Sequence, residues 1–491
     1  MAVKLIYTDI AIGAAEDASV STSAKETFSA AEKIPFGVDT GSVATLEKNS
    51  WGLELENKVR ASQPFAFWST TTSDAEGAFA SPPQITLEFD AQYTSTGLTF
   101  RFAPGVNEYC PEIVVYWYQN GAVRDNGIFY PTSAQYALEN TVEAFDKVVI
   151  YFMKTSLPHR RVKIEHIEIG IIREFDGEEL TSASFIHELD LISDTVPVNV
   201  MDATFHSSTD TDYIFQKKQP VDAYDGEDLI GVYYIESGER TGARDYSISC
   251  QDAIGVLDLD TYAGGLWFTA TAISDIISDI VNGAFVVDIS EDLTNVKLRG
   301  HIPECTKREA LQHVAFAAGA CIDTSGTSHI KVFTAPTGEE TRIPAAETYT
   351  GGQVDTSDIV TAVSLMAYGI SNRTPGDDED TIEINGVEYP ITETEYIAEN
   401  PNVTAGTLAN VVSYSGCYLI NSDNAQARAE AVLSHYMRRN LYSAAHVLKG
   451  QKLGQRVAVT LPWGGTVSGN ITKMELSISG INASDSEFLL D

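Results

Sequence analysis

The amino-acid sequence predicts a mainly β protein with a few helices, an α+β chain of several domains. Apolar and polar residues alternate in many short runs, which is the pattern of half-buried strands. Helical spacing of apolar residues is clear in three stretches. Because 43% of the 491 residues are hydrophobic, the chain can build sizeable cores. At roughly 100–200 residues per domain, this length predicts three or four domains.

The chain is strongly acidic, with 69 Asp and Glu against 32 Lys and Arg and a formal net charge of -37. This charge argues against broad binding of nucleic acid or anionic lipid, since both need many Lys and Arg side chains. The N-terminal residues contain no continuous apolar run, and no apolar run is long enough for a membrane span, so we expect neither a signal peptide nor a membrane helix.

The five cysteines are widely spaced and form no C-x-x-C pair, which favours reduced, buried thiols over disulfides or a zinc site. They are Cys110, Cys250, Cys305, Cys321 and Cys417. No P-loop, G-x-G-x-x-G, H-E-x-x-H or G-x-S-x-G motif occurs. We therefore expect no catalytic residues, no cofactor and no metal. A glycosidase needs only two carboxylates that face each other across the sugar. With 69 Asp and Glu, the sequence offers too many such pairs to single one out.

Residues 60–172 carry the pattern of a β-sandwich. Residues 85–89, 98–102 and 162–169 alternate, whereas 113–118 and 148–153 are continuous apolar runs that we expect to be buried on both faces. Turns are predicted at Pro104-Gly105, Asn120-Gly121 and Asn126-Gly127. The start Ile85-Thr-Leu-Glu-Phe89 and the end Ile164-Glu-His-Ile-Glu-Ile-Gly170 resemble discoidin-type, galactose-binding-like jelly-roll sandwiches. Residues 1–59 would precede this domain as an arm with strands.

Sugar recognition uses aromatic faces together with polar loop residues, and this region is rich in aromatic side chains. Trp117 lies inside an apolar strand and is expected in the core. The candidate glycan-binding residues are Arg124, Tyr130 and Trp68.

The following part of the chain predicts further strands at 181–185, 196–200, 229–235 and 246–250, and then three helices. The first helix, 271–281, has an isoleucine stripe and a stop at Asn282-Gly283. The second runs from Thr306, which forms a capping box with Glu309, to Gly319. The third spans about 424–440, and strands return from 449 to 488. The acidic run Pro375 to Asp380 reads either as a calcium loop or as an exposed hairpin tip, and the absence of EF-hand ligand spacing favours the tip.

From residue 173 onward the sequence resembles the central hub proteins of bacteriophage tails, which share their fold with the hub of type VI secretion spikes. The segments that carry this resemblance are 193–202, 219–235, 246–258, the helix 306–319, 450–457 and 469–479. The resemblance implies a first tube-like β-domain at 173–265, a helix-containing domain at 266–335, and a second tube-like β-domain with closing β elements at 336–491. Simpler hubs lack the front sandwich. No needle, lysozyme-like or peptidase segment is found after residue 480.

The resemblance further implies a structural virion protein, assembled in the bacterial cytoplasm and located in the tail. As a homotrimeric ring on the tail axis, it would join the tail tube and distal tail proteins to a spike or tip protein. It would contact the tape-measure protein and let DNA pass without specific binding, through a bore lined by carboxylates. The missing fused tip favours a contractile tail. Host surface glycan would be a partner of the sandwich.

Cations are scarce in this chain, so those at helix ends are candidate subunit or tube contacts. They are Lys307, Arg308, Arg438 and Arg439. The alternatives are a carbohydrate-binding adhesin, supported by the sandwich, and a tail-associated glycan-degrading enzyme.

Overall fold

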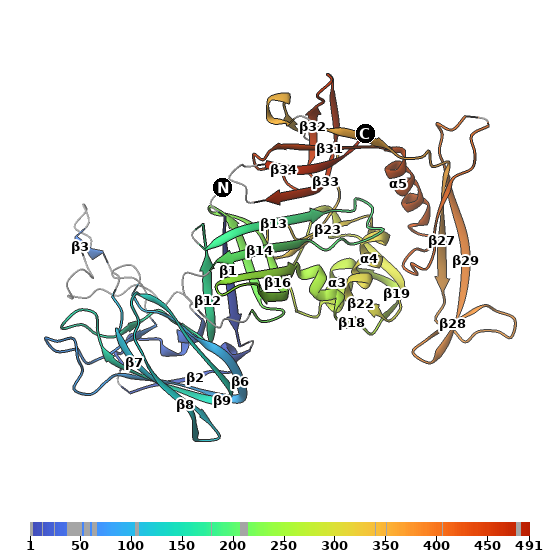
Figure 1. The fold of residues 1–491 in the computed structure, drawn as a ribbon. Coiled ribbons are helices and arrows are strands. Elements are labelled where there is room, and N and C mark those ends of the chain that lie inside the picture. Colours follow the sequence, from blue (N-terminus) through green and yellow to red (C-terminus); the bar gives the residue numbers. More distant parts are fainter. Residues whose placement is uncertain are drawn as a thin grey trace. The chain divides into compact units, whose positions relative to one another are not determined.

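The computed structural model describes all residues except 1–2, 12, 24, 37–51, 54–58, 61–65, 104–107, 178, 207–214, 339, 350, 405 and 478–482. The chain forms two compact units (Figure 1). We call Ile6–Glu174 the N-terminal unit, and Met1–Leu5 with Phe175–Asp491 the C-terminal unit. The division falls within two strands, β1 (Val3–Ile10) and β12 (Gly170–Phe175).

The N-terminal unit contains a sheet of the order β11-β6-β9-β7-β8, with β2 also paired to β6, and a small sheet of β5 and β10. The strands are β2 (Ser19–Thr22), β5 (Phe67–Trp68), β6 (Gln84–Arg101), β7 (Glu112–Gln119), β8 (Ala122–Phe129), β9 (Gln135–Lys154), β10 (Lys163–Ile164) and β11 (His166–Glu168). A short pair, β3 (Gly52–Leu53) and β4 (Val59–Arg60), the four-residue helix α1 (Ala14–Asp17) and the 3-10 helix η1 (Ala31–Phe36) complete the described elements.

Two predicted strands of this unit, 85–89 and 98–102, are the two ends of the single long strand β6. The register between β6 and β9 shifts three times between Glu88 and Gly97. Such irregularities bend a strand without ending it, so the interrupted alternation of the sequence looked like a break.

The predicted turn at Asn120-Gly121 is confirmed, because both residues have positive φ, 49° and 79°, and they link β7 to β8. The turn predicted at Asn126-Gly127 is wrong, since Gly127 pairs with Val115 inside β8. A side chain at Gly127 would meet the Phe129 ring, so the glycine serves packing rather than a turn. The predicted Pro104-Gly105 turn lies outside the described residues.

Strand β7 was predicted to be buried on both faces, and this is wrong. Ile113, Val115 and Trp117 are buried in the core of the unit, whereas the alternate residues Val114, Tyr116 and Tyr118 are half-buried. Strand β9 is closer to the prediction, because its residues 148–150 are all buried.

The C-terminal unit is built on one large sheet, in which the strands run β15-β16-β17-β14-β13-β33-β34-β31-β26, with β32 paired to both β33 and β25. Strands β13 and β33 join residues from both ends of the unit in antiparallel register, with Phe185 opposite Leu476 (Figure 1). The strands are β13 (Leu180–Glu188), β14 (Val200–His206), β15 (Pro220–Asp225), β16 (Asp228–Arg240), β17 (Asp245–Gln251), β25 (Thr341–Ile343), β26 (Gln353–Thr356), β31 (Asn440–Val447), β32 (Arg456–Thr460), β33 (Thr466–Ser477) and β34 (Ala483–Leu490).

The strands predicted at 181–185, 229–235 and 246–250 are confirmed as β13, β16 and β17, but the strand predicted at 196–200 is wrong. β14 begins only at Val200, because Asn199 is held by other contacts. Its side-chain oxygen accepts from the Glu188 N–H at 2.9 Å, and its amide donates to Thr324 at 2.9 Å.

The three predicted helices are present as α3 (Ile273–Val281), α4 (Lys307–Ala318) and α5 (Ala425–Met437). The capping box of Thr306 and Glu309 is formed, and Gly319 and Asn282 adopt the left-handed conformation at the C-termini of α4 and α3. A short helix, α2 (Ala253–Asp258), was not predicted, and Asp252 caps it. The helices share one core, in which the isoleucines of α3 are buried.

Three small sheets are formed by strands that precede or follow α3 and α4 in the sequence. They pair β18 with β22, β19 with β21, and β24 with both β20 and β23. Their strands are β18 (Thr261–Tyr262), β19 (Gly265–Ala272), β20 (Val287–Ile289), β21 (Lys297–Ile302), β22 (Cys305–Thr306), β23 (Cys321–Asp323) and β24 (Ile330–Phe333). The short 3-10 helices are η3 (Glu291–Leu293) and η4 (Ala345–Glu347).

A four-stranded sheet of the order β28-β29-β27-β30 packs against α5. Its strands are β27 (Ala362–Ile370), β28 (Thr381–Ile384), β29 (Val387–Glu399) and β30 (Val411–Tyr414). The acidic run 375–380 lies in the exposed loop before β28, where Glu379 pairs with Arg373 and accepts from the Gly376 N–H at 2.7 Å.

Candidate functional site

One face of the large sheet is lined by small hydroxyl side chains and carboxylates. Directly opposed residues in antiparallel strands share a face. The pairing register therefore sets Ser237, Ser249, Asp202, Ser184 and Ser477 in one row across β16, β17, β14, β13 and β33. The next row contains Glu239, Ser247, Thr204 and Ser182. We call this surface the polar sheet face.

The polar sheet face continues onto β15, β34 and the far ends of these strands through the same register. Its carboxylates are Glu188, Asp202, Asp222, Glu239, Asp245, Glu475, Asp485 and Glu487. Among the described residues of these rows, Lys473 is the single Lys or Arg, and its Nζ lies 3.0 Å from both Glu188 and Glu475. The face is therefore strongly acidic.

The two rows form a hollow of about 440 Å³. Within it, the Ser182 and Thr204 hydroxyls lie 2.6 Å apart, and the Ser249 hydroxyl donates to Asp202. Short side chains that bond to one another leave the surface smooth and free of aromatic rings. It offers hydrogen bonds and negative charge.

The opposite face of the same strands explains why the rows are so regular. Alternate residues such as Ala183, Phe185 and Ile248 are buried, so the hydroxyl residues between them must face outward. Behind them, His187 and Tyr233 share a hydrogen bond in the core. Burial lowers the pKa of His187 to about 4, so this imidazole is neutral at physiological pH.

The sequence analysis identified β13, β16 and β17 of this surface but not β14, and it did not place any acid on a particular face. The signal was present in two short segments, Thr181-Ser-Ala-Ser-Phe185 and Tyr246-Ser-Ile-Ser-Cys250, where serine occupies every second position. That these serines form one continuous row depends on the pairing of β13, β14 and β17.

Two of the predicted contact residues, Lys307 and Arg308, make bonds inside the unit. The Arg308 guanidinium donates to the Val196 carbonyl at 2.7 Å and to Asp258 at 3.1 Å. The Lys307 ammonium lies 3.5 Å from Asp260. The bonds to Asp258 and Asp260 attach the start of α4 to the end of α2 and the residues after it, and a role of both cations in subunit contacts stays a prediction.

Arg438 also forms hydrogen bonds within the C-terminal unit. At the end of α5, it donates to Asn470 at 2.9 Å and to the carbonyls of Leu489 and Leu490. Arg439 differs, because it donates to the Ser357 carbonyl at 2.8 Å and has no carboxylate within ion-pair distance among the described residues. All four cations stay predicted contacts, and among them Arg439 is the one without an ion pair in the described part of the chain.

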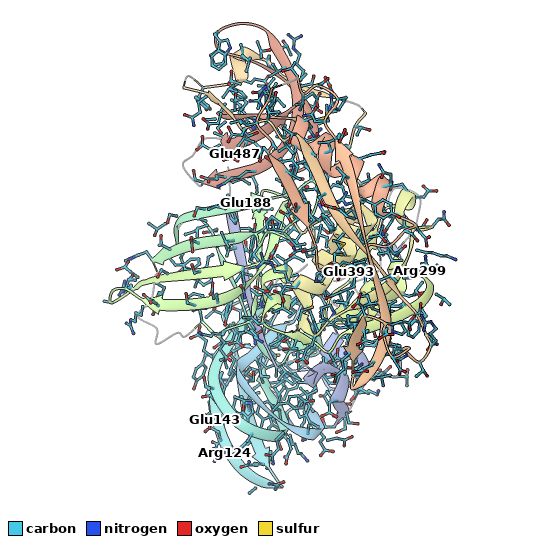
Figure 2. The ribbon with its side chains drawn as sticks, turned by 90° about the vertical axis from the view of Figure 1, so that its right-hand side faces the viewer. Arg124, Glu143, Glu188, Arg299, Glu393 and Glu487 are labelled. Carbon is cyan, nitrogen blue, oxygen red and sulfur yellow. The ribbon has the colours of Figure 1, made fainter. Side chains whose placement is uncertain are left out.

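The three candidate glycan residues are separated by their burial. Arg124 lies on β8, the edge strand of its sheet, and is exposed (Figure 2). Tyr130, the first residue after β8, is 62% exposed. Trp68 is only 1% exposed, with the Lys163 ammonium 5.3 Å from its ring and Phe28 against its edge. The expectation that Trp68 stacks on a sugar is therefore corrected, since both neighbours occupy its ring.

A set of tyrosines in the N-terminal unit was not proposed as a site from the sequence. Tyr116, Tyr118 and Tyr151 lie on the outer face of β7 and β9, with ring centroids of neighbouring pairs 6.0 and 6.4 Å apart. The exposed Ile128 lies on the same face, opposite Val114. We call this surface the tyrosine face.

In the described part of the chain, no group of three or more His, Cys, Asp and Glu side chains could hold a metal ion. No helix there is long and apolar enough to cross a membrane. All five cysteines are free, and four are buried as predicted. Burial raises the thiol pKa of Cys321 and Cys417 to about 12, so neither is a ready nucleophile.

No protein-family model matches this chain, and no curated protein does. Among solved structures, it is similar to a tail protein from Neisseria meningitidis MC58, at 13% identity and a TM-score of 0.45, covering 65% of this chain and 93% of that chain. It is also similar to the 43 kDa tail protein of prophage MuSo2 from Shewanella oneidensis, at 9% identity and a TM-score of 0.46, covering 64% and 95%.

A third similar structure is prophage tail protein gp18 from Listeria monocytogenes EGD-e, at 10% identity and a TM-score of 0.43, covering 65% of this chain and 90% of that chain. With TM-scores below 0.5, these likenesses carry no argument about the role of this chain. All three are described as tail proteins, two of them from prophages.

Proposed function

We propose that this chain is a structural protein of a phage tail and forms the central hub of its baseplate or tail tip, with the polar sheet face lining the passage for DNA. The observation that carries this proposal is the pair of hydroxyl and carboxylate rows across β16, β17, β14, β13 and β33. A polyanion adheres where Lys and Arg displace its counterions. A wall of Ser, Asp and Glu repels phosphate within a Debye length of about 8–10 Å and gives it no cation to bind.

The proposed assembly is a homotrimeric ring on the tail axis, because closed rotational symmetry would place the polar sheet faces of all copies around one passage. The partners in this proposal are the tail tube and distal tail proteins on one side, a spike or tip protein on the other, and the tape-measure protein in the passage. The protein would be assembled in the bacterial cytoplasm and reside in the virion, in a contractile tail. The proposal contains no catalytic step.

The test is the mass of the full-length protein in solution, followed by its position in purified particles by electron cryomicroscopy. The expected result is a trimer on the tail axis with Asp202 and Ser184 facing the bore. A stable monomer at particle-like concentrations, or an axial ring whose bore is lined by another surface with Lys and Arg, would overturn the proposal.

A second candidate function, glycan binding by the N-terminal unit, is favoured by a specific observation. Exposed Arg124 and Tyr130 lie at or just beyond the edge strand β8, and the tyrosine face belongs to the same sheet. Tyrosine rings pack against sugar C–H groups, and an arginine can bond to hydroxyls.

We would test glycan binding with the full chain on host cell-wall material. Tyr130→Ala and Arg124→Ala should each reduce retention, whereas Glu143→Gln, an acid on β9 of the same unit, should not. Absence of binding to any host envelope fraction would remove this function and leave the sheet edge for contacts with other tail proteins.

A further inference from the structure

We propose that a groove in the C-terminal unit binds a basic polypeptide segment of a different protein. The groove has a volume of about 410 Å³ and lies where β13, β33 and β34 meet the last turn of α5. Its apolar lining comes from Leu189, Leu191, Ile192, Pro197, Leu441 and Leu489. We call it the acidic groove.

The acidic groove carries an excess of negative charge. Four acids line it, Asp190, Asp194, and Glu188 and Glu487, which are labelled in Figure 2. The single cation of the lining is Lys473, and its Nζ lies 3.0 Å from Glu188. His435 adds no positive charge, because burial lowers the pKa of its imidazole. Among the described residues, neither Asp194 nor Glu487 has a cation within ion-pair distance.

Asp194 is the acid that we expect to bind a cation in the groove. Its carboxyl pKa is raised, first by burial and then by the nearby Asp190 charge, and the nearby Tyr414 hydroxyl offsets only part of this effect. A half-buried carboxylate next to a like charge is unfavourable until a cation approaches. A Lys or Arg side chain laid along the groove would relieve this cost and gain a charge-assisted hydrogen bond.

A smaller pocket of about 80 Å³ shares Asp194 with the groove. Aromatic and apolar side chains line it, including Phe316, Tyr414 and Leu365, and the Phe316 and Tyr414 rings lie 5.2 Å apart. The Arg428 guanidinium of this chain already lies 4.7 Å from the Phe316 ring. The pocket would accept the apolar stem of a long basic side chain and place its charged end near the Tyr414 ring and the Asp194 carboxylate.

The charge of the lining disfavours a nucleic acid and a second copy of this chain as occupants of the groove. Phosphate of a nucleic acid would meet the same unpaired carboxylates that attract a cation. A second copy of this chain is a poor source of basic segments, because its net charge is -37 and Lys307, Arg308 and Arg438 are bonded within the unit. An alternating apolar and basic segment of another protein matches both the Leu lining and the acids.

The proposal is tested by calorimetric titration of the full-length protein with the peptide acetyl-Leu-Arg-Leu-Arg-Leu-Arg-amide, with the Glu-for-Arg peptide as a control. The Arg peptide should bind, and added salt should weaken it. Asp194→Asn and Glu487→Gln should each weaken binding by at least roughly fivefold. Glu393→Gln, on the exposed surface of β29 (Figure 2), is the matched control and should leave the affinity unchanged.

The proposal is overturned if the Arg peptide gives no heat at about 1 mM, or if Glu393→Gln weakens binding as much as Asp194→Asn, which would mean unspecific attraction. It is also overturned if the groove variants change the mass of the assembly and not the peptide affinity, since a second copy would then be the occupant. The groove does not depend on the hub role, so a monomeric protein that binds the peptide would remove the hub proposal alone.

Discussion

Strands β7 and β13 obey the same alternation but place opposite kinds of side chain outward. β7, in the N-terminal unit, turns Val114, Tyr116 and Tyr118 to its outer face, and β13, in the C-terminal unit, turns out Ser182 and Ser184. Burial selects the inner residues of both strands, so only the outer residues are free to differ. Half-exposed tyrosines suit a surface that meets another molecule, whereas short hydroxyls suit a surface past which something moves.

The largest expected effect separates the two cores. Phe185→Ala removes a ring that is 1% exposed and packs 5.8 Å from the Tyr233 ring, so it should cost about 3–5 kcal/mol of unfolding free energy. Hydrogen exchange should then increase in residues 175–491 and not in 6–174. The matched variant Trp117→Ala, in the core of the N-terminal unit, should give the reverse pattern. Loss of protection in both units from either variant would show that they unfold together.

The second effect is a pH dependence that belongs to the C-terminal unit. Asp252 is buried, and burial raises its pKa to about 6 although Thr324, Gly255 and Asn199 donate to its carboxylate. Because its folded pKa lies above its unfolded value near 4, the folded state holds this proton more tightly. The stability that this proton contributes is present below about pH 4 and is lost as pH rises to about 6.

Asp252→Asn removes this titration, so comparing the variant with the native sequence isolates the contribution of the Asp252 carboxyl. The unfolding free energy of the variant relative to the native sequence should increase by about 2–3 kcal/mol between pH 4 and pH 7. Denaturant unfolding at several pH values measures it, and the difference cancels the opposite contribution of His187. A difference that does not vary with pH would mean that the Asp252 carboxyl titrates normally.

A smaller effect concerns the α-helices, which among the described residues are longer than four residues only in the C-terminal unit. Thr306→Ala removes the side chain that accepts from the Glu309 N–H at 3.2 Å and should cost about 1 kcal/mol. Exchange should rise first in the initial turn of α4. Thr306→Ser, which keeps the hydroxyl, should restore protection. If it does not, contacts of the threonine methyl group, and not the cap, stabilise this end.

The smallest effect on stability tests the contrast between the two outer faces directly. Ser184→Lys combined with Ser249→Lys should change the unfolding free energy by less than about 1 kcal/mol, because Ser184 is exposed, and a lysine at the half-buried position 249 can pair with Asp202 in place of the serine hydroxyl. It should nevertheless make the protein retain duplex DNA at low salt, and added salt should abolish this retention. The neutral pair Ser184→Gln and Ser249→Gln should retain none. Equal behaviour of both pairs would show that charge on this face has no such consequence.

Local chemistry made several elements predictable. The Thr306 hydroxyl and the Glu309 carboxylate satisfy backbone groups within one turn of helix, and Asn120-Gly121 and Asn282 need only their own backbone preferences. The isoleucine spacing of 273–281 likewise fixes which side of α3 is buried. None of these features depends on residues distant in the sequence.

The surfaces were less predictable, because each depends on distant partners. The residues next to Arg438 in the sequence do not indicate that its guanidinium donates hydrogen bonds to Asn470, Leu489 and Leu490. Likewise, the burial of Trp68 depends on Lys163 and Phe28, which are distant in the sequence. The Asn-Gly dipeptide at 126–127 carries the same local signal as that at 120–121. Pairing with β7 and the ring of Phe129 decide that it remains in a strand.

The sequence by itself determined that the chain is acidic, rich in strands, and provided with three capped or striped helices, because composition and short-range periodicity need no tertiary partner. Only the tertiary structure decided that β13 pairs with β33, which brings residues near 185 and 476 into one sheet. That pairing extends the row that contains Ser184 to Ser477 on β33 and closes one side of the acidic groove. Strand pairing over such a separation is selected by side-chain packing across the whole unit, and no local pattern encodes it.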